Sequence, residues 1–177
     1  VLGVTAISLA GNEEQKTELL AGIAAGEITT ALAVDEKIHH SPTQTAMTAE
    51  KKGDSYLLSG VKRYVVDGST ADKLIVVTRT AGKPGDMKGI SLFIVDRAAE
   101  GISVERTQMV DGRNAAIINF TNVKVGSDAL LGEQDGGFRT LSATLDAGNA
   151  HLAAELLGIS QESFDRTLQY MKERKQF

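Results

Sequence analysis

The hydrophobic period of this sequence changes near residue 28, and that change limits the folds open to the chain. Between residues 28 and 130, short runs rich in β-branched and aromatic residues recur at intervals of roughly ten residues, separated by turn-forming Asp-Gly and Pro-Gly-Asp segments. Short strands at this spacing are typical of antiparallel sandwiches and barrels. We therefore expect an antiparallel β-barrel or sandwich domain in the middle of the chain.

Two runs in this region are apolar without interruption, namely Leu-Ile-Val-Val at 74–77 and Leu-Phe-Ile-Val at 92–95. Continuous apolar strands are typically buried on both faces, so we expect both in the middle of the sheet. The run Ala-Ile-Ile-Asn-Phe at 116–120 alternates more and is expected to have one solvated face.

Helical patterns flank the β region. Residues 1–10 are compatible with the end of a buried helix that stops at Gly11, and Asn12 with Gln15 forms a capping-box pattern for a second helix. Gly26 is its expected end.

After residue 131 the helical period returns and persists to the end of the sequence. Its apolar positions are Leu141, Leu145, Leu152, Leu156, Ile159, Phe164, Leu168 and Met171. The pattern predicts one long amphipathic helix, or two helices broken near Gly148 or Gly158. Such a helix cannot bury its stripe against a small β domain, so partner helices must come from outside this segment or from another subunit.

Composition narrows the function classes. The formal charge of −4 leaves no basic surface for nucleic acid, and no apolar run approaches the roughly 20 residues that span a bilayer. The absence of cysteine excludes disulfides and thiolate chemistry, and a cytoplasmic protein fits best.

The sequence offers few metal or acid/base motifs. His39 and His40 are adjacent, His151 stands alone, and we expect no metal site. The neighbouring carboxylates of Asp35 and Glu36 are interpreted as a solvated edge, because sequence neighbours rarely converge.

The cluster Lys62, Arg63 and Tyr64 precedes Val-Val-Asp-Gly and leaves two interpretations open. It could present an aromatic ring at a strand end to a planar ligand, or it could be an edge strand with charged side chains that reach solvent.

The order of several segments resembles the acyl-CoA dehydrogenase family. These segments are Gly-Asp-x-Tyr-x-Leu-x-Gly-x-Lys-x-Tyr at 53–64, Gly-Ile-Ser-Leu-Phe-Ile-Val at 89–95, Phe-x-x-Val-x-Val at 120–125, Leu-Leu-Gly-x-x-x-Gly-Gly-Phe at 130–138 and Lys-Glu-Arg-Lys-Gln-Phe at 172–177. The resemblance covers nearly the whole chain.

The resemblance implies an α+β fold in which partial helical domains flank the β domain. Residues 1–27 would end an N-terminal helical domain, 28–130 would form the middle β domain, and 131–177 would begin a C-terminal helical bundle. It also implies FAD as cofactor, an acyl-CoA substrate, an electron-transfer flavoprotein as electron acceptor, and a homo- or hetero-oligomer.

By resemblance, FAD lies between the β domain and the bundle. The strand that carries Lys-x-Phe/Trp-Ile-Thr-Asn in the family reads Tyr64, Val65 and Val66 here, and Val66 lacks the hydroxyl that bonds the flavin. The family's flavin and substrate loop corresponds to Leu32, Ala33 and the residues up to Ser41. Its Thr, Pro and Gly-Ser are not reproduced.

The end of the chain resembles an Arg-x-x-Phe motif that binds the FAD pyrophosphate and adenine of a neighbouring subunit. Arg174, Gln176 and Phe177 take these positions, and a guanidinium suits bidentate phosphate recognition. The other interpretation is a solvated helix end.

The family's Asp-x-Gly-Arg substrate motif reads Asp146, Ala147, Gly148 and Asn149 here, so the arginine charge is lost. One subgroup carries its catalytic glutamate at the position of Gly148, and we expect the base outside this chain. The alternatives are a flavin monooxygenase of the same fold and a non-catalytic partner subunit in a heteromeric dehydrogenase.

Overall fold

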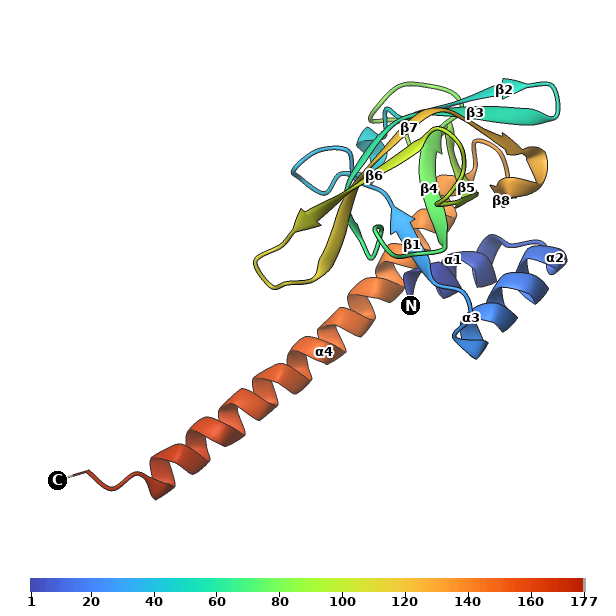
Figure 1. The fold of residues 1–177 in the computed structure, drawn as a ribbon. Coiled ribbons are helices and arrows are strands. Elements are labelled where there is room, and N and C mark those ends of the chain that lie inside the picture. Colours follow the sequence, from blue (N-terminus) through green and yellow to red (C-terminus); the bar gives the residue numbers. More distant parts are fainter. Residues whose placement is uncertain (177) are drawn as a thin grey trace.

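The change of hydrophobic period coincides with a change from helices to strands in the computed structural model, which describes residues 1–176. The strands are β1 Thr30–Ala33, β2 Thr48–Lys52, β3 Ser55–Val66, β4 Lys73–Arg79, β5 Ile90–Asp96, β6 Ile102–Gln108, β7 Asn114–Gly126 and β8 Leu130–Leu131. They form one eight-stranded sheet that curls around its own core (Figure 1).

The strand order is β6-β7-β3-β2-β4-β5-β8, with β1 added beside β4. Most pairs are antiparallel, as expected from the turn spacing, whereas β1 runs parallel to β4 and β2 meets β4 in parallel at one residue pair. The predicted α+β class with a barrel-like β domain is confirmed, with one parallel addition.

Two apolar cores lie on the two sides of this sheet. In β4, Leu74 and Val76 face the core inside the curled sheet, while Ile75 and Val77 face a second core under the helices. All four side chains are fully buried, which confirms the expected two-sided burial of this run. Each contributes roughly 1.5–3 kcal/mol through removal of apolar surface from water.

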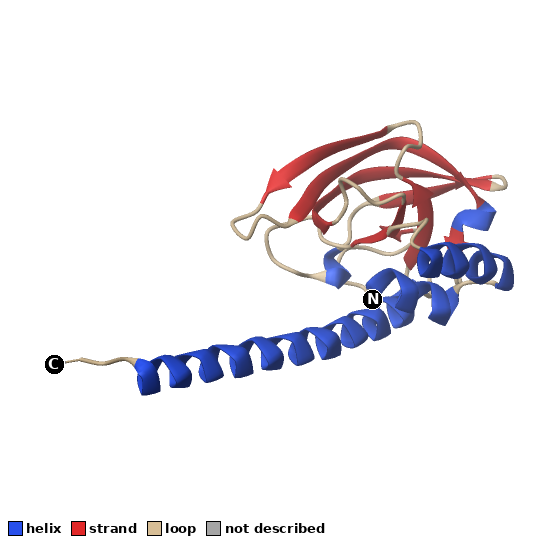
Figure 2. Ribbon diagram, turned by 60° about the horizontal axis from the view of Figure 1, so that its bottom comes forward, coloured by secondary structure: helices blue, strands red, loops and turns tan. Residues whose placement is uncertain are grey.

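The N-terminal helices form the layer over that second core (Figure 2). They are α1 Leu2–Ala10, α2 Glu13–Gln15, the π-helix η1 Lys16–Leu20 and α3 Ala21–Ala25. The capping box is confirmed, because Asn12 Oδ1 accepts from Gln15 N at 2.8 Å and Gln15 Oε1 accepts from Asn12 N at 3.1 Å. Gly26 ends α3 in the left-handed region, with φ of 75°.

Helix α4 runs from Gly137 to Glu173 without a break at Gly148 or Gly158. Only its first turns pack against the sheet, where Gly137, Leu141 and Thr144 are buried. The rest projects away from the β domain (Figures 1 and 2), and its apolar stripe is exposed. The described part of this chain thus leaves the stripe without the partner helices that its pattern requires.

The domain boundary expected between residues 130 and 131 falls inside β8, where Leu131 is fully buried and pairs with Leu92 of β5. Among residues 1–176, no helix has the length and apolar character needed to traverse a membrane.

Candidate functional site

A cleft of about 350 Å³ opens where α1, β1, the end of β3 and α4 meet. Residues from all four elements and from the segment after β1 line it, namely Val1, Leu2, Gly3, Thr30, Ala31, Leu32, Val34, Asp35, His40, Arg63, Tyr64, Val65, Val66, Asp67 and Leu145. We call it the Tyr64 cleft. Its volume is within the range of small-molecule sites.

A β-bulge shapes the Tyr64 side of this cleft. The register between β3 and β7 shifts between Lys62 and Val65, and Tyr64 has a φ of 52°. A positive φ is uncommon for a bulky residue, and such backbone strain concentrates at functional sites. The bulge turns the Arg63 N–H toward the carbonyl of Asp35, at 2.7 Å, and leaves Tyr64 42% exposed.

Four of the five cofactor residues expected from the strands lie in the Tyr64 cleft. The Leu32 side chain is half-buried and the Val66 side chain is exposed. The Val65 side chain instead points into the core of the curled sheet and is 2% exposed. Ala33 is fully buried in the same core. Only its backbone is therefore available to a ligand.

A buried ion pair fixes the loop that forms the next wall of the cleft. Lys62 Nζ donates to Glu36 Oε1 and to the carbonyl of Val34, both at 2.8 Å. The Glu36 carboxylate also accepts from the backbone N–H groups of Ala46 and Met47, at 2.9 and 3.0 Å. These bonds tie both ends of the loop to β3, and we call the Lys62–Glu36 pair the loop clamp.

The loop clamp excludes one of the two interpretations of the Lys62 cluster and corrects the expectation for Glu36. Lys62 is not a charge on an edge strand that reaches solvent, because β3 lies between β2 and β7 and the Lys62 side chain is fully buried. Glu36 is not part of a solvated edge, because its side chain is 12% exposed and its oxygens are all bonded. Lys62 shares the inward face of β3 with Tyr56 and Leu58, and that period-two spacing was the missed signal.

Burial lowers the pKa of Lys62 from 10.5 to about 8, because desolvation disfavours the ammonium. The charge of Glu36 and its hydrogen bond oppose this shift, and Asp35 adds a smaller attraction. Lys62 therefore loses its charge at a lower pH than an ordinary lysine does.

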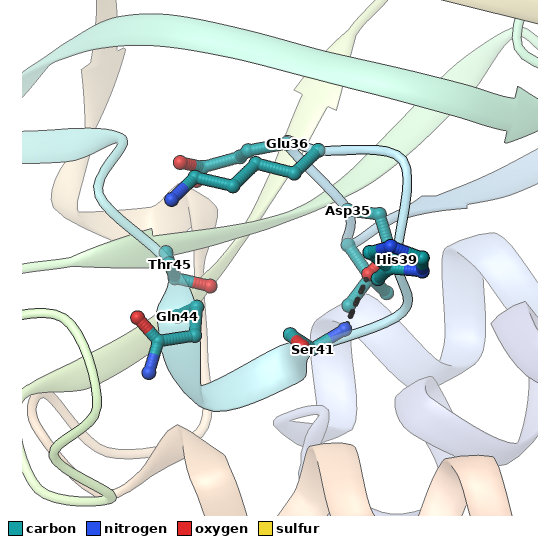
Figure 3. Close-up of a pocket in the computed structure, with 8 residues that line it drawn as sticks. Asp35, Glu36, His39, Ser41, Gln44 and Thr45 are labelled. Carbon is teal, nitrogen blue, oxygen red and sulfur yellow. Dashed lines mark hydrogen bonds between the residues drawn. The ribbon is translucent and has the colours of Figure 1, made fainter.

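Asp35 lines both the Tyr64 cleft and a second cavity of about 250 Å³. Figure 3 shows Asp35 among the residues around this second cavity. One carboxylate oxygen is 2.8 Å from His40 Nδ1, and the other accepts from the Ser41 N–H at 3.1 Å. The second cavity is lined by Ser41, His39 and Gln44, among others, so the predicted substrate residue Ser41 lies at a cavity beside the cleft. The sequence had suggested only solvated histidines, and the Asp35–His40 pair was missed.

No three His, Asp or Glu side chains within residues 1–176 converge in a way that could hold a metal ion. His151 bonds only to the backbone carbonyl of Ala147 one turn earlier on α4, at 2.8 Å.

The predicted substrate residues of α4 flank the cleft. Asp146 and Asn149 are exposed, and Leu145 beside them lines the Tyr64 cleft. Gly148 lies against Leu2 of α1, since a Cβ at Gly148 would stand 2.6 Å from Leu2 Cδ2. Gly148 thus lets the two helices approach closely.

Arg174 and Gln176, two of the predicted pyrophosphate residues, follow the end of α4, which lies far from the β domain (Figure 1). The Arg174 guanidinium is 5.4 Å from the centre of the Tyr170 ring. Gln176 follows in the same extended tail, and Phe177 lies outside the described residues.

The lining of the Tyr64 cleft fits a planar ring with a polar edge. Leu2, Leu32 and Leu145 supply apolar surface, and Tyr64 adds an exposed aromatic ring. Donors come from Thr30, His40, Arg63 and the Tyr64 hydroxyl, whereas the Val66 side chain has none. Flavin is such a ring, and the apolar and donor groups of the lining suit it.

The comparisons with known proteins agree with this geometry. Residues 17–125 match the model of the acyl-CoA dehydrogenase middle domain. The chain is 38% identical to the 3-(aryl)acrylate reductase of Clostridium sporogenes, covering 98% of this chain and 47% of that protein. It is 35% identical to an acyl-CoA dehydrogenase of Bacillus subtilis, covering 99% and 47%.

Among solved structures, butyryl-CoA dehydrogenase from Megasphaera elsdenii superposes with a TM-score of 0.91 at 28% identity, covering 99% of this chain and 47% of that chain. The chain thus spans about half the length of the curated relatives it matches. The family model matches most of the β domain of this chain, and the butyryl-CoA dehydrogenase structure shares the fold of the helical flanks as well. This chain therefore belongs to the acyl-CoA dehydrogenase family.

Proposed function

We propose that the full-length protein binds FAD with the flavin ring in the Tyr64 cleft and desaturates an acyl-CoA thioester between its α and β carbons. The observation that carries this proposal is the cleft itself, where a bulge with a positive φ at Tyr64 exposes an aromatic ring between apolar walls. Membership of the acyl-CoA dehydrogenase family supports the reaction type. FAD would supply the hydride acceptor, and an electron-transfer flavoprotein would take the electrons onward.

The residues of this chain would bind and orient the reactants. Tyr64, Leu32 and Leu145 would hold the ring and exclude water from it, with backbone groups of Ala33, Val65 and Val66 at its edge. The loop clamp would fix Asp35 and Ser41 beside the ring. The catalytic base would come from outside this chain.

The substrate and the neighbouring subunit would meet the same region. We assign Ser41, Asp146 and Asn149 to the acyl-CoA side, because they lie at the second cavity and on α4 beside Leu145. Arg174, Gln176 and Phe177 would contact the FAD of a second subunit in a homo- or hetero-oligomer, consistent with the distance of the described tail from the cleft.

The test uses the purified full-length protein and its flavin absorbance spectrum. We expect stoichiometric FAD and bleaching of the flavin band under anaerobic conditions with at least one member of a panel of straight, branched, aryl and steroid acyl-CoAs. FAD that is bound but never reduced by an acyl-CoA would defeat the dehydrogenase assignment, and substrate-dependent oxygen consumption would favour a flavin monooxygenase.

A second candidate is a partner subunit that carries structure rather than catalysis in a heteromeric dehydrogenase. Val66 at the cleft edge has no hydroxyl, and Asn149 replaces the family's arginine, so both positions lose polar contacts. Full-length protein that lacks FAD alone but acquires activity with an encoded homologue would support this candidate. Stoichiometric, acyl-CoA-reducible FAD in the isolated protein would eliminate it.

A further inference from the structure

Asp35 and His40, in the loop after β1, form a hydrogen-bonded ionisable pair in the lining of the Tyr64 cleft. The two side chains are 2.8 Å apart, with 24% and 56% of their surfaces exposed. Asp35 is held from a second side by the Ser41 N–H. The carboxylate is thus oriented on both oxygens, and it orients the imidazole in turn.

This geometry sets the chemistry of the imidazole. A carboxylate only accepts hydrogen bonds, so the proton of neutral His40 resides on Nδ1 and Nε2 is left as an acceptor. When the ring is protonated, Nε2 becomes a donor. Among the described residues, only Asp35 bonds to the His40 ring.

The Val66 side chain offers the Tyr64 cleft no hydrogen-bond donor. Val66 presents only methyl groups, and the edge of an oxidised isoalloxazine carries ring nitrogens and carbonyl oxygens that accept hydrogen bonds. His40 is a lining side chain whose free Nε2 can donate to those acceptors only when the ring is protonated, whereas the neutral ring can only accept, for example from the flavin N3–H.

Resting on the FAD-binding function proposed above, we propose that His40, positioned by Asp35, is a protonation-dependent hydrogen-bond donor to the polar edge of the flavin ring. The other ionisable groups that line the cleft are Arg63, Tyr64 and Asp67, from the end of β3 and the turn after it. The lining residues of α1, β1 and α4 carry no ionisable side chain.

The test measures FAD affinity of the full-length protein at about pH 5.5 and about pH 7.5, which divide the range in which histidine changes charge. Lys62, with a pKa of about 8, begins to lose its charge near the upper value, and the His40→Gln variant, which keeps Lys62, reports that contribution separately. We expect the wild type to bind FAD about tenfold more tightly at the lower pH, as a charge-assisted hydrogen bond implies.

Variants separate this role from a structural one. His40→Gln should abolish the pH dependence and bind at the weaker level, while His40→Lys, with a fixed positive charge, should bind tightly at both pH values. His39→Gln is the matched control, because His39 lines the second cavity and not the Tyr64 cleft, and it should behave as the wild type. Asp35→Asn should shrink the pH effect.

Binding of riboflavin, which has the flavin ring but no phosphate, tests whether His40 acts on the ring or on the phosphates of FAD. Riboflavin should show the same His40-dependent pH effect. A pH effect seen with FAD alone, an effect equally lost in His39→Gln, or His40→Gln binding like the wild type would each overturn the inference while leaving the proposed function intact. Absence of flavin binding by the wild type at both pH values would overturn the proposed function and the inference with it.

Discussion

A single buried ammonium controls how the loop after β1 is held, because Lys62 bonds to Glu36 and Val34 at once. Removing one partner of a buried ion pair leaves the other desolvated, which typically costs about 3–5 kcal/mol. We therefore expect Lys62→Met to lower the free energy of unfolding in urea by roughly 3 kcal/mol. Lys124→Met, which changes an exposed lysine of β7, should have almost no effect.

The double variant Lys62→Met/Glu36→Gln should recover part of that loss, since replacing both partners removes the uncompensated charge. A loss below about 1 kcal/mol for Lys62→Met, or strictly additive losses, would show that the loop clamp does not hold the loop.

The lowered pKa of Lys62 gives a pH dependence with a definite sign. The folded-state pKa is about 8 and the ordinary value 10.5, so between these values the unfolded chain binds more protons and stability rises with pH. Relative to Lys62→Met, the wild type should gain on the order of 3 kcal/mol between about pH 7.5 and about pH 11. A flat difference across this window would contradict the shifted ionisation.

At the scale of elements, the Tyr64 cleft depends on how closely α1 approaches β1. A Cβ on Gly3 would stand 1.9 Å from Thr30 Oγ1 and 2.9 Å from Thr30 Cβ, so any side chain there must push the helix off the strand. We expect Gly3→Ala to cost about 1–3 kcal/mol of unfolding free energy and to weaken FAD binding.

Two further variants provide a control and a rescue for that prediction. Val4→Ala, on the exposed side of α1, should leave both measurements nearly unchanged, while Thr30→Ala added to Gly3→Ala should restore part of the stability by removing the nearest atom. Wild-type stability in Gly3→Ala would mean that α1 is not packed as described.

The elements themselves were largely predictable, and the site was predictable only in part. Periodicity located the strands of 74–77 and 92–95 and the capping box at Asn12, because burial and capping depend on residues close in sequence. The loop clamp was not foreseen, since it depends on how β3 meets a loop some 26 residues earlier in the chain. The Asp35–His40 pair is only five residues apart, but it depends on an irregular loop conformation that no periodic pattern describes. Parallel addition of β1 was likewise set by the helices that position it.

At the scale of the whole molecule, α4 carries an apolar stripe that the described chain leaves exposed, including Leu156, Ile159 and Phe164. In the full-length protein we expect other helices to cover it, because exposed isolated helices are marginal in water. Leu156→Asp should therefore accelerate hydrogen exchange of amides 150–173 by at least about tenfold, by placing a charge in the covered face.

Gln161→Asp, which substitutes an exposed polar residue of the same helix, is the matched control and should leave that exchange nearly unchanged. Equal protection in wild type and Leu156→Asp would mean that the stripe stays in solvent in the complete protein.

The contact between Leu2 and Gly148 joins two walls of the Tyr64 cleft, since Leu2 and Leu145 both line it. Because Gly148 has no side chain, α4 lies close against α1 here, and Leu145 about one turn earlier lines the cleft together with Leu2. Under the proposed function, helices that pack on the far end of α4 would fix the position of the wall that Leu145 contributes.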